Sequence, residues 1–240
     1  MPIVGDARRL SSGDAVRILV ALAVALLTPQ AEAQDTIPVA VELVLALDSS
    51  ASVDREEFQL QLDGLAAALR DADVLQAVDN LKPLGAAIAV VQWGGPGETR
   101  IVLPFTAIAS SRDAKAFGFR VSLIRRWLRA SSTSIATAID DSRALIASNE
   151  FDGFRKVIDV SGDGPDNSGA DLDGARARAH ADEITVNGLP IMADDETLDA
   201  YYRDHVTVGA TSFVEPAKDF NDYARAIKEK LLRELRALDS

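Results

Sequence analysis

A run of seven mostly apolar residues, followed at once by an aspartate and several serines, constrains this chain more than any other feature. The run is Val41–Leu47, and Asp48, Ser50 and Ser52 follow it. A continuous apolar run is typical of a strand buried on both faces, as in a parallel sheet covered by helices. Such sheets bind ligands at the carboxyl ends of their strands. The three side chains offer hard oxygen atoms, so the sequence predicts a site for Mg²⁺ or a similar hard cation at this edge.

Two later positions offer oxygen atoms in the same kind of setting. Thr133 stands just before a helical pattern that starts at Ile135, and Asp163 with Gly164 ends a strand pattern that starts at Lys156. Either feature alone is typical of a helix cap or a turn. Three signals in this order, each at a strand exit or a helix entry, are far more specific than any one of them.

Together these signals resemble the metal-ion-dependent adhesion site of von Willebrand factor type A (vWA) domains. The stretches 157–165 and 187–191 are also similar to those of a bacterial family of exported vWA-like proteins known only as a domain of unknown function. The resemblance implies that one hard cation, Mg²⁺ or another such as Mn²⁺ or Ca²⁺, is held by five residues: Asp48, Ser50, Ser52, Thr133 and Asp163. One departure is that Ser131 and Ser132 stand where many vWA sites have glycines, which would make this loop stiffer.

Strand and helix patterns alternate along the rest of the chain and predict an α/β fold with helices on both faces of the sheet. The expected strands are 41–47, 85–93, 100–104, 156–164, 183–191 and 207–214. The expected helices are 54–69, 110–130, 135–146, 173–182, 195–203 and 220–235. The resemblance implies a doubly wound, mostly parallel six-stranded sheet in the order 3-2-1-4-5-6, with strand 3 antiparallel at one edge.

The N-terminal residues carry the features of a secretory signal peptide. Three arginines precede a ten-residue apolar run, 18–27, and Ala31-Glu32-Ala33 offers a cleavage pattern before Gln34. We therefore expect a signal peptide over 1–33, a short linker over 34–38 and a vWA-like domain over 39–240. The mature protein would be periplasmic or secreted, without a stable membrane span. An uncleaved anchor is the alternative, although the run is shorter than the roughly 20 residues of a membrane-spanning helix.

Composition and net charge exclude several kinds of binding surface and covalent link. The formal net charge of −12 argues against a nucleic-acid or anionic membrane surface, which would need clustered lysine and arginine. The absence of cysteine excludes disulfides, thiolate metal sites and a lipid-anchored cysteine. Arg125, Arg126 and Arg129 are expected to form the basic C-terminal end of the 110–130 helix, where they suit the helix dipole.

Three functions are compatible with this pattern. The leading hypothesis is an exported, metal-dependent protein-binding module, in which a partner's acidic residue completes the coordination of the ion. A metal-dependent hydrolase or phosphotransfer enzyme on the same fold is the second, and a structural domain with a lapsed metal site is the third. The only histidines, His180 and His205, are expected to be surface or capping residues, and Asp159 a hydrogen-bonded structural carboxylate. We therefore predict no catalytic residue.

Overall fold

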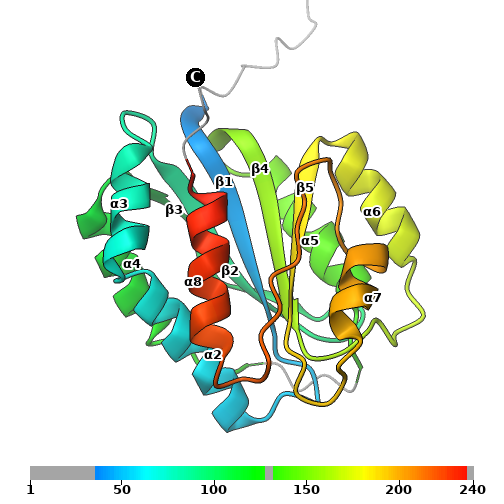
Figure 1. Cartoon of the computed structure of the whole chain (residues 1–240). Coiled ribbons are helices and arrows are strands. Elements are labelled where there is room, and N and C mark those ends of the chain that lie inside the picture. The colour runs from blue at the N-terminus through cyan, green and yellow to red at the C-terminus, as the bar shows by residue number, and fades with distance from the viewer. Residues whose placement is uncertain (1–35, 128–131, 237–240) are drawn as a thin grey trace, which may run out of the picture. The chain divides into compact units, whose positions relative to one another are not determined.

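A five-stranded, mostly parallel sheet forms the centre of the computed structural model, which describes residues 36–127 and 132–236. The strand order is β3-β2-β1-β4-β5 (Figure 1). The strands are β1 (Ile37–Asp48), β2 (Ala86–Trp93), β3 (Thr99–Ile108), β4 (Phe151–Gly162) and β5 (Ile184–Pro190). Neighbouring strands are parallel, except that β3 runs antiparallel to β2 at one edge. The predicted α/β class, the order of the first five strands and the antiparallel third strand are confirmed.

The predicted sixth strand, 207–214, is wrong. This segment pairs with β5 through two isolated bridges, made by Val208 and Val214, and a third bridge joins Ala217 to Ile191 just beyond them. The Val208 bridge is antiparallel and the other two are parallel, so the chain reverses direction between them. Gly209 has a φ of 100° in the turn where this reversal begins, a conformation that favours glycine. A segment that turns back on itself covers the β5 edge but cannot add a regular strand.

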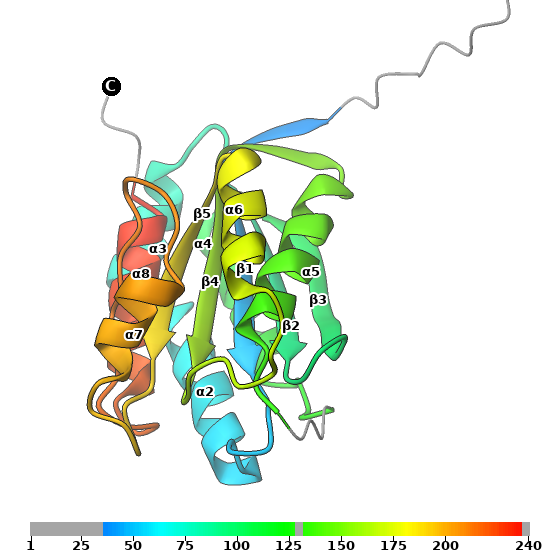
Figure 2. The same ribbon diagram turned by 90° about the vertical axis from the view of Figure 1, so that its right-hand side faces the viewer.

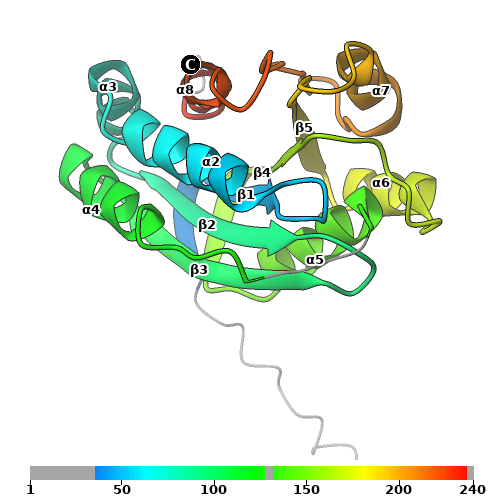
Figure 3. The same ribbon diagram turned by 90° about the horizontal axis from the view of Figure 1, so that it is seen from below.

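Helices cover both faces of the sheet, as predicted. One face is covered by α2 (Arg55–Ala68), α3 (Ala72–Asn80), α4 (Ser111–Val121) and α8 (Tyr223–Glu234). The other is covered by α5 (Ile135–Ala147), α6 (Leu172–Ala181) and α7 (Leu198–His205). Helices α2 and α8 lie side by side, and this pairing is visible in Figures 1 and 3. Two buried apolar clusters, one on each side of the sheet, form the core.

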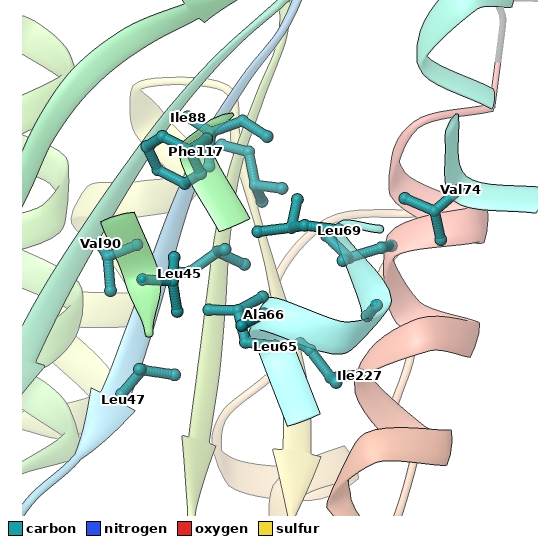
Figure 4. Packing of buried hydrophobic residues seen from close by; sticks show 14 of the residues in the cluster. Leu45, Leu47, Leu65, Ala66, Leu69, Val74, Ile88, Val90, Phe117 and Ile227 are labelled. Carbon is teal, nitrogen blue, oxygen red and sulfur yellow. The ribbon is translucent and has the colours of Figure 1, made fainter. Parts of the chain in front are cut away.

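Helix α2 starts and packs as its sequence predicts. Asp54 caps its N-terminus in a capping box with Glu57, at the start of the predicted 54–69 helix. Leu65 on its apolar face is fully buried and lies between Leu45 of β1 and Ile227 of α8 (Figure 4). Burying one such leucine contributes about 1.5–3 kcal/mol. The helix that follows the serine loop is thus held firmly against the central strand.

The helices differ most from the prediction in two places. The 110–130 helix ends at Val121, and 122–127 is not helical. The side-chain amide of Gln92 explains this, because it donates to the Arg125 carbonyl at 2.7 Å and accepts from the Trp127 N–H at 2.9 Å. These main-chain groups are therefore bonded to β2, and the predicted basic helix end is wrong. Helix α3 is the second difference, since no helix was predicted between 69 and 85.

The start of the domain lies slightly earlier than expected. Strand β1 begins at Ile37, so two residues of the predicted linker belong to the sheet. The predicted signal peptide lies outside the described residues. Within 36–127 and 132–236, no helix combines the length and the apolar character needed to cross a membrane.

Candidate metal centre

The carboxyl ends of β1 and β4 lie side by side at one edge of the sheet. Leu47 is paired with Ser161 in the parallel register of the two strands, and Asp48 and Asp163 follow just beyond. Figure 2 shows the strand arrowheads and the loops after them at this common lower edge. Parallel strands place their following loops together, so the topology brings distant parts of the chain into one place.

A continuous chain of hydrogen bonds joins four of the five predicted site residues. The Ser50 N–H donates to Asp48 Oδ1 at 2.7 Å, and the hydroxyl oxygens of Ser50 and Ser52 are 3.1 Å apart. The Ser52 hydroxyl then donates to Asp163 Oδ1 at 2.8 Å. Ser52 and Asp163 are 111 positions apart in the sequence. The structure therefore gathers these oxygen atoms as expected, while metal binding by them stays a prediction.

Thr133 lies in a neighbouring loop and makes no hydrogen bond to the other four residues. It is 5% exposed, and its N–H donates to Asn167 Oδ1 at 2.8 Å. Asn167 in turn donates its N–H to the Thr133 carbonyl at 3.0 Å. The next residue, Ser134, donates to the Gly94 carbonyl at 2.7 Å and caps α5. The threonine loop is therefore fixed between the end of β2 and the loop that follows Asp163.

The two aspartates give the site an unbalanced negative charge. Asp48 is fully buried, and burial together with the nearby Asp163 carboxylate raises its pKa to about 7. Burial also raises the pKa of Asp163. Oδ2 of Asp48 has no hydrogen-bond partner among the described residues. A buried carboxylate oxygen without a partner is costly, and a bound cation would satisfy it.

Two aromatic side chains close the space beneath Asp48. A Cβ atom at Gly162 would lie 2.8 Å from the Tyr202 hydroxyl, 2.9 Å from Asp48 Oδ2 and 3.1 Å from a ring carbon of Trp93. Only glycine fits here, because a Cβ would overlap these three groups. Tyr202 and Trp93 are fully buried, and their polar atoms have no hydrogen-bond partner among the described residues. The floor of the site is therefore aromatic but carries two free hydrogen-bond donors.

Two side chains that the sequence analysis did not assign to the site hold the serine loop in place. Arg126 donates to the main-chain carbonyls of Ser49 and Ser50 at 3.0 and 2.7 Å. Gln61 of α2 donates to the Asp48 carbonyl at 3.1 Å. A signal for Gln61 was present, because this buried polar residue interrupts the apolar face of α2. Arg126 had no such signal, since its position depends on where α4 ends.

The remaining predicted features contribute little to this edge. His180 and His205 are both exposed, on α6 and α7 respectively. Throughout 36–127 and 132–236, no three acidic, histidine or cysteine side chains are grouped so that they could hold a metal. A cation at Asp48 would therefore depend on hydroxyl oxygens as well as on carboxylates. That donor set suits a hard cation, which keeps several of its water ligands.

A protein-family model matches residues 38–239 of the chain, and its description is "Protein of unknown function (DUF1194)". The chain belongs to the DUF1194 family. The match covers the whole described domain, from β1 to α8. No curated protein matches this DUF1194 sequence.

Solved structures similar to this DUF1194 protein are vWA domains. Proximal thread matrix protein 1 from the mussel byssus is 17% identical, with a TM-score of 0.62 over 82% of this chain and 48% of that protein. The same mussel protein solved with a zinc-occupied MIDAS motif has a TM-score of 0.58, at 17% identity over 83% of this chain and 48% of that one. A von Willebrand factor type A protein from Catenulispora acidiphila is 18% identical, with a TM-score of 0.55 over 82% of this chain and 43% of that one.

These similarities establish the fold. The DUF1194 chain spans about half the length of these similar proteins, and it has the vWA fold. The resemblance drawn from the Asp-x-Ser-x-Ser pattern and its two later partners is thereby confirmed at the level of fold.

Proposed function

We propose that this protein is an exported, metal-dependent protein-binding module. A divalent cation at the carboxyl edge of the sheet would be held by five side chains: Asp48, Ser50, Ser52, Thr133 and Asp163. The ion would then bind a carboxylate of a partner protein. The function is recruitment or adhesion, and no covalent chemistry is required.

The observation that carries this proposal is a pair of neighbouring aspartates, Asp48 and Asp163, that no basic side chain of the described residues neutralises. Burial and the nearby Asp163 carboxylate both disfavour ionisation of Asp48, and Asp48 Oδ2 is buried without a partner among the described residues. Arg126 is the basic side chain at the serine loop, but it binds main-chain carbonyls rather than either carboxylate. A divalent cation would balance both charges and use the free carboxylate oxygen.

The serine hydroxyls determine what such a cation can do. Ser50 and Ser52 are neutral ligands, so an ion bound through them keeps much of its positive charge. An ion of this kind attracts one more anionic oxygen, and a carboxylate from another protein can supply it. The mussel protein with a zinc-occupied MIDAS motif supports a divalent cation at this position of the fold. The choice among Mg²⁺, Mn²⁺, Ca²⁺ and Zn²⁺ is a matter for titration.

The decisive experiment combines metal binding with partner capture. The mature protein and its Asp48→Ala variant are titrated calorimetrically with each of the four cations. Both are then used to capture proteins from the exported fraction, with the preferred cation or with a chelator. We expect the wild type to bind one cation and to retain a specific partner only in its presence, and the variant to do neither. A wild type that binds no cation, or a partner retained equally with chelator, would contradict the proposal.

Export is tested separately. We expect the protein recovered from the periplasm or the medium to begin at Gln34, because the Ala31-Glu32-Ala33 pattern precedes it. N-terminal sequencing of that material measures this directly. A chain that still begins before Ile18 would exclude cleavage of the predicted signal peptide.

A further inference from the structure

A groove of about 560 Å³ lies beside the metal centre, between the edge strand β3 and the non-helical segment that follows α4. Residues 100–103 form one wall, and residues from 120 to 127 form the other. We call this feature the arginine groove. Strand β3 is an edge of the five-stranded sheet, so one wall of the groove belongs to the periphery of the domain.

The groove presents large apolar side chains to solvent. The side chains of Ile101, Leu123 and Trp127 line the groove and are 49%, 63% and 55% exposed. A bound partner could bury these apolar surfaces. Single exposed apolar residues are common, but three of them around one concave surface mark a site of interaction. Aromatic side chains such as Trp127 are especially frequent among the residues that dominate binding energy.

The groove is also basic, in contrast to the chain as a whole. Among the described residues, its lining includes Arg100, Arg120 and Arg125 and no carboxylate, whereas the whole chain has a net charge of −12. The guanidinium of Arg100 lies 4.2 Å from the centre of the Trp127 ring. Arg120 donates to the Thr106 hydroxyl at 3.2 Å. Two of the three arginines are therefore held in place, and a held guanidinium binds a carboxylate at a lower cost in entropy.

The wall of the groove is joined to the metal centre by side-chain hydrogen bonds. Gln92 bonds the main chain on both sides of Arg126, and Arg126 bonds the carbonyls of Ser49 and Ser50. The segment that carries Arg125 and Trp127 is thus directly attached to the serine loop. A partner that reaches the ion is therefore next to the groove.

We propose that the arginine groove binds an extended segment of a partner protein that carries carboxylates and large apolar side chains. Its carboxylates would pair with the groove arginines, and its apolar side chains would cover Leu123 and Trp127. Charge complementarity selects this occupant, since a basic or purely polar segment would match neither property. The inference rests on the proposed function only in taking the partner to be a protein, because the groove needs no metal.

The test uses three pools of labelled peptides of equal length and the mature full-length domain. The first pool carries Asp or Glu with Leu, Phe or Trp, the second Lys or Arg with the same apolar residues, and the third Asp or Glu with Ser or Gly. Binding is measured by fluorescence anisotropy in Mg²⁺ and, separately, in a chelator. The wild type should prefer the first pool in both conditions, and added salt should weaken that binding.

Matched variants separate the groove from the rest of the surface. Leu123→Ser and the pair Arg100→Ser with Arg125→Ser should each weaken binding of the first pool by about tenfold, with or without Mg²⁺. Phe119→Ser is the apolar control, because Phe119 is 60% exposed on α4 but does not line the groove. Arg112→Ser is the basic control, since Arg112 is exposed on the same helix outside the groove. Circular dichroism confirms that each variant is folded.

The outcomes distinguish this inference from the proposed function. Groove variants that bind the first pool as tightly as the controls would overturn the inference, even if a chelator abolishes binding. Equal binding of the acidic and basic apolar pools, or no binding of any pool, would also overturn it. A groove-dependent dimer of the domain that excludes the peptides would assign the groove to a second copy of the chain instead. Weaker peptide binding by the groove variants, without any effect of Mg²⁺ or of Asp48→Ala, would support the groove, while the metal-dependent function is decided separately by the calorimetric titration and the partner capture.

Discussion

Strand β4 takes part in two buried acidic clusters, and only one of them contains its own cation. In the inner cluster, Lys230 of α8 places its ammonium 3.1 Å from Asp159 Oδ1 and 3.4 Å from Glu234 Oε1. At the carboxyl edge, neither Asp48 nor Asp163 forms an ion pair with a lysine or arginine of the described residues, and the nearby Arg126 bonds main-chain carbonyls instead. In the inner cluster, a buried lysine side chain of this chain neutralises the carboxylates. At the carboxyl edge, no side chain of the described residues has this role, as expected if a cation from solution binds there.

The two clusters also differ in what acts on the pKa of their most buried aspartates, Asp48 and Asp159. Burial raises the pKa of Asp159 to about 7, although Lys230 acts in the opposite direction. Burial also raises the pKa of Asp48 to about 7, and there the neighbouring Asp163 adds to the effect. Asp159 is therefore a structural carboxylate, as the sequence predicted, but an ion pair rather than a hydrogen bond accounts for it.

The largest effect is expected from removing the internal cation. Lys230→Met leaves Asp159 and Glu234 buried without a positive partner, which should lower the free energy of unfolding by about 3–5 kcal/mol. Urea denaturation measures it. The matched control is Lys228→Met on the same helix, whose pairs with Asp71 and Asp73 are partly exposed, so that about 1 kcal/mol or less should be lost. If Lys230→Met were as stable as the wild type, the claim that Lys230 stabilises the inner acidic cluster would be wrong.

Adding the missing cation should have the next largest effect. At a concentration 100 times its dissociation constant, the preferred cation should stabilise the wild type by about 2.7 kcal/mol and leave Asp48→Asn unchanged. In a chelator, Asp48→Asn should be at least as stable as the wild type, because the repulsion by Asp163 is removed. Thermal denaturation with and without cation measures both effects. Asp63→Asn on the exposed face of α2 is the control and should respond like the wild type.

The pH dependence of stability sharpens the comparison further. Because the pKa of Asp159 is raised from 3.8 to about 7 by folding, the folded state binds the extra proton between these values. This contribution to stability is present below about pH 4 and is lost as the pH rises towards 7. The free energy of unfolding of Asp159→Asn should therefore fall less steeply between about pH 4 and 7 than that of the wild type, by up to about 1.4 kcal/mol per pH unit.

This effect is measured by urea denaturation in a chelator across that pH range. The charged and titratable groups that act on Asp159 among the described residues are Lys230, Glu234 and Tyr223 of α8 and Tyr202 of α7, and all four remain in the variant. Asp48 titrates in both proteins, so the difference between them isolates Asp159. An identical pH dependence of wild type and variant would show that Asp159 stays ionised.

The smallest effect is expected from a single hydroxyl of the edge cluster. Ser52→Ala removes the hydrogen bond to Asp163 and one predicted ligand, which should weaken cation binding by about 1 kcal/mol. Calorimetric titration measures it, and stability in a chelator should hardly change because Ser52 is exposed. Ser49→Ala is the control, since the Ser49 hydroxyl bonds the Trp93 carbonyl instead of a carboxylate. Equal losses in the two variants would argue against a special role for Ser52.

Local patterns in the sequence were sufficient for much of the fold and of the site. The apolar run before Asp48 predicted a buried central strand, and the helical pattern over 54–69 predicted α2. These features could be predicted because strand burial and helical periodicity depend on residues within a few positions of one another. The joining of Ser52 to Asp163 followed from the rule that the carboxyl ends of parallel strands share one edge.

Contacts between distant residues decided the rest. Helical periodicity continued past Val121, but Gln92 of β2 bonds the main chain at Arg125 and Trp127 and holds that segment out of a helix. The 207–214 segment has the composition of a strand, yet it reverses at Gly209 and only bridges the β5 edge. Likewise, the sequence identified Asp48 and Asp159 as acidic residues at or within buried strands. Only the tertiary structure placed Lys230 beside Asp159 and, among the described residues, no lysine beside Asp48, because the approach of α8 to β4 depends on how the whole core packs.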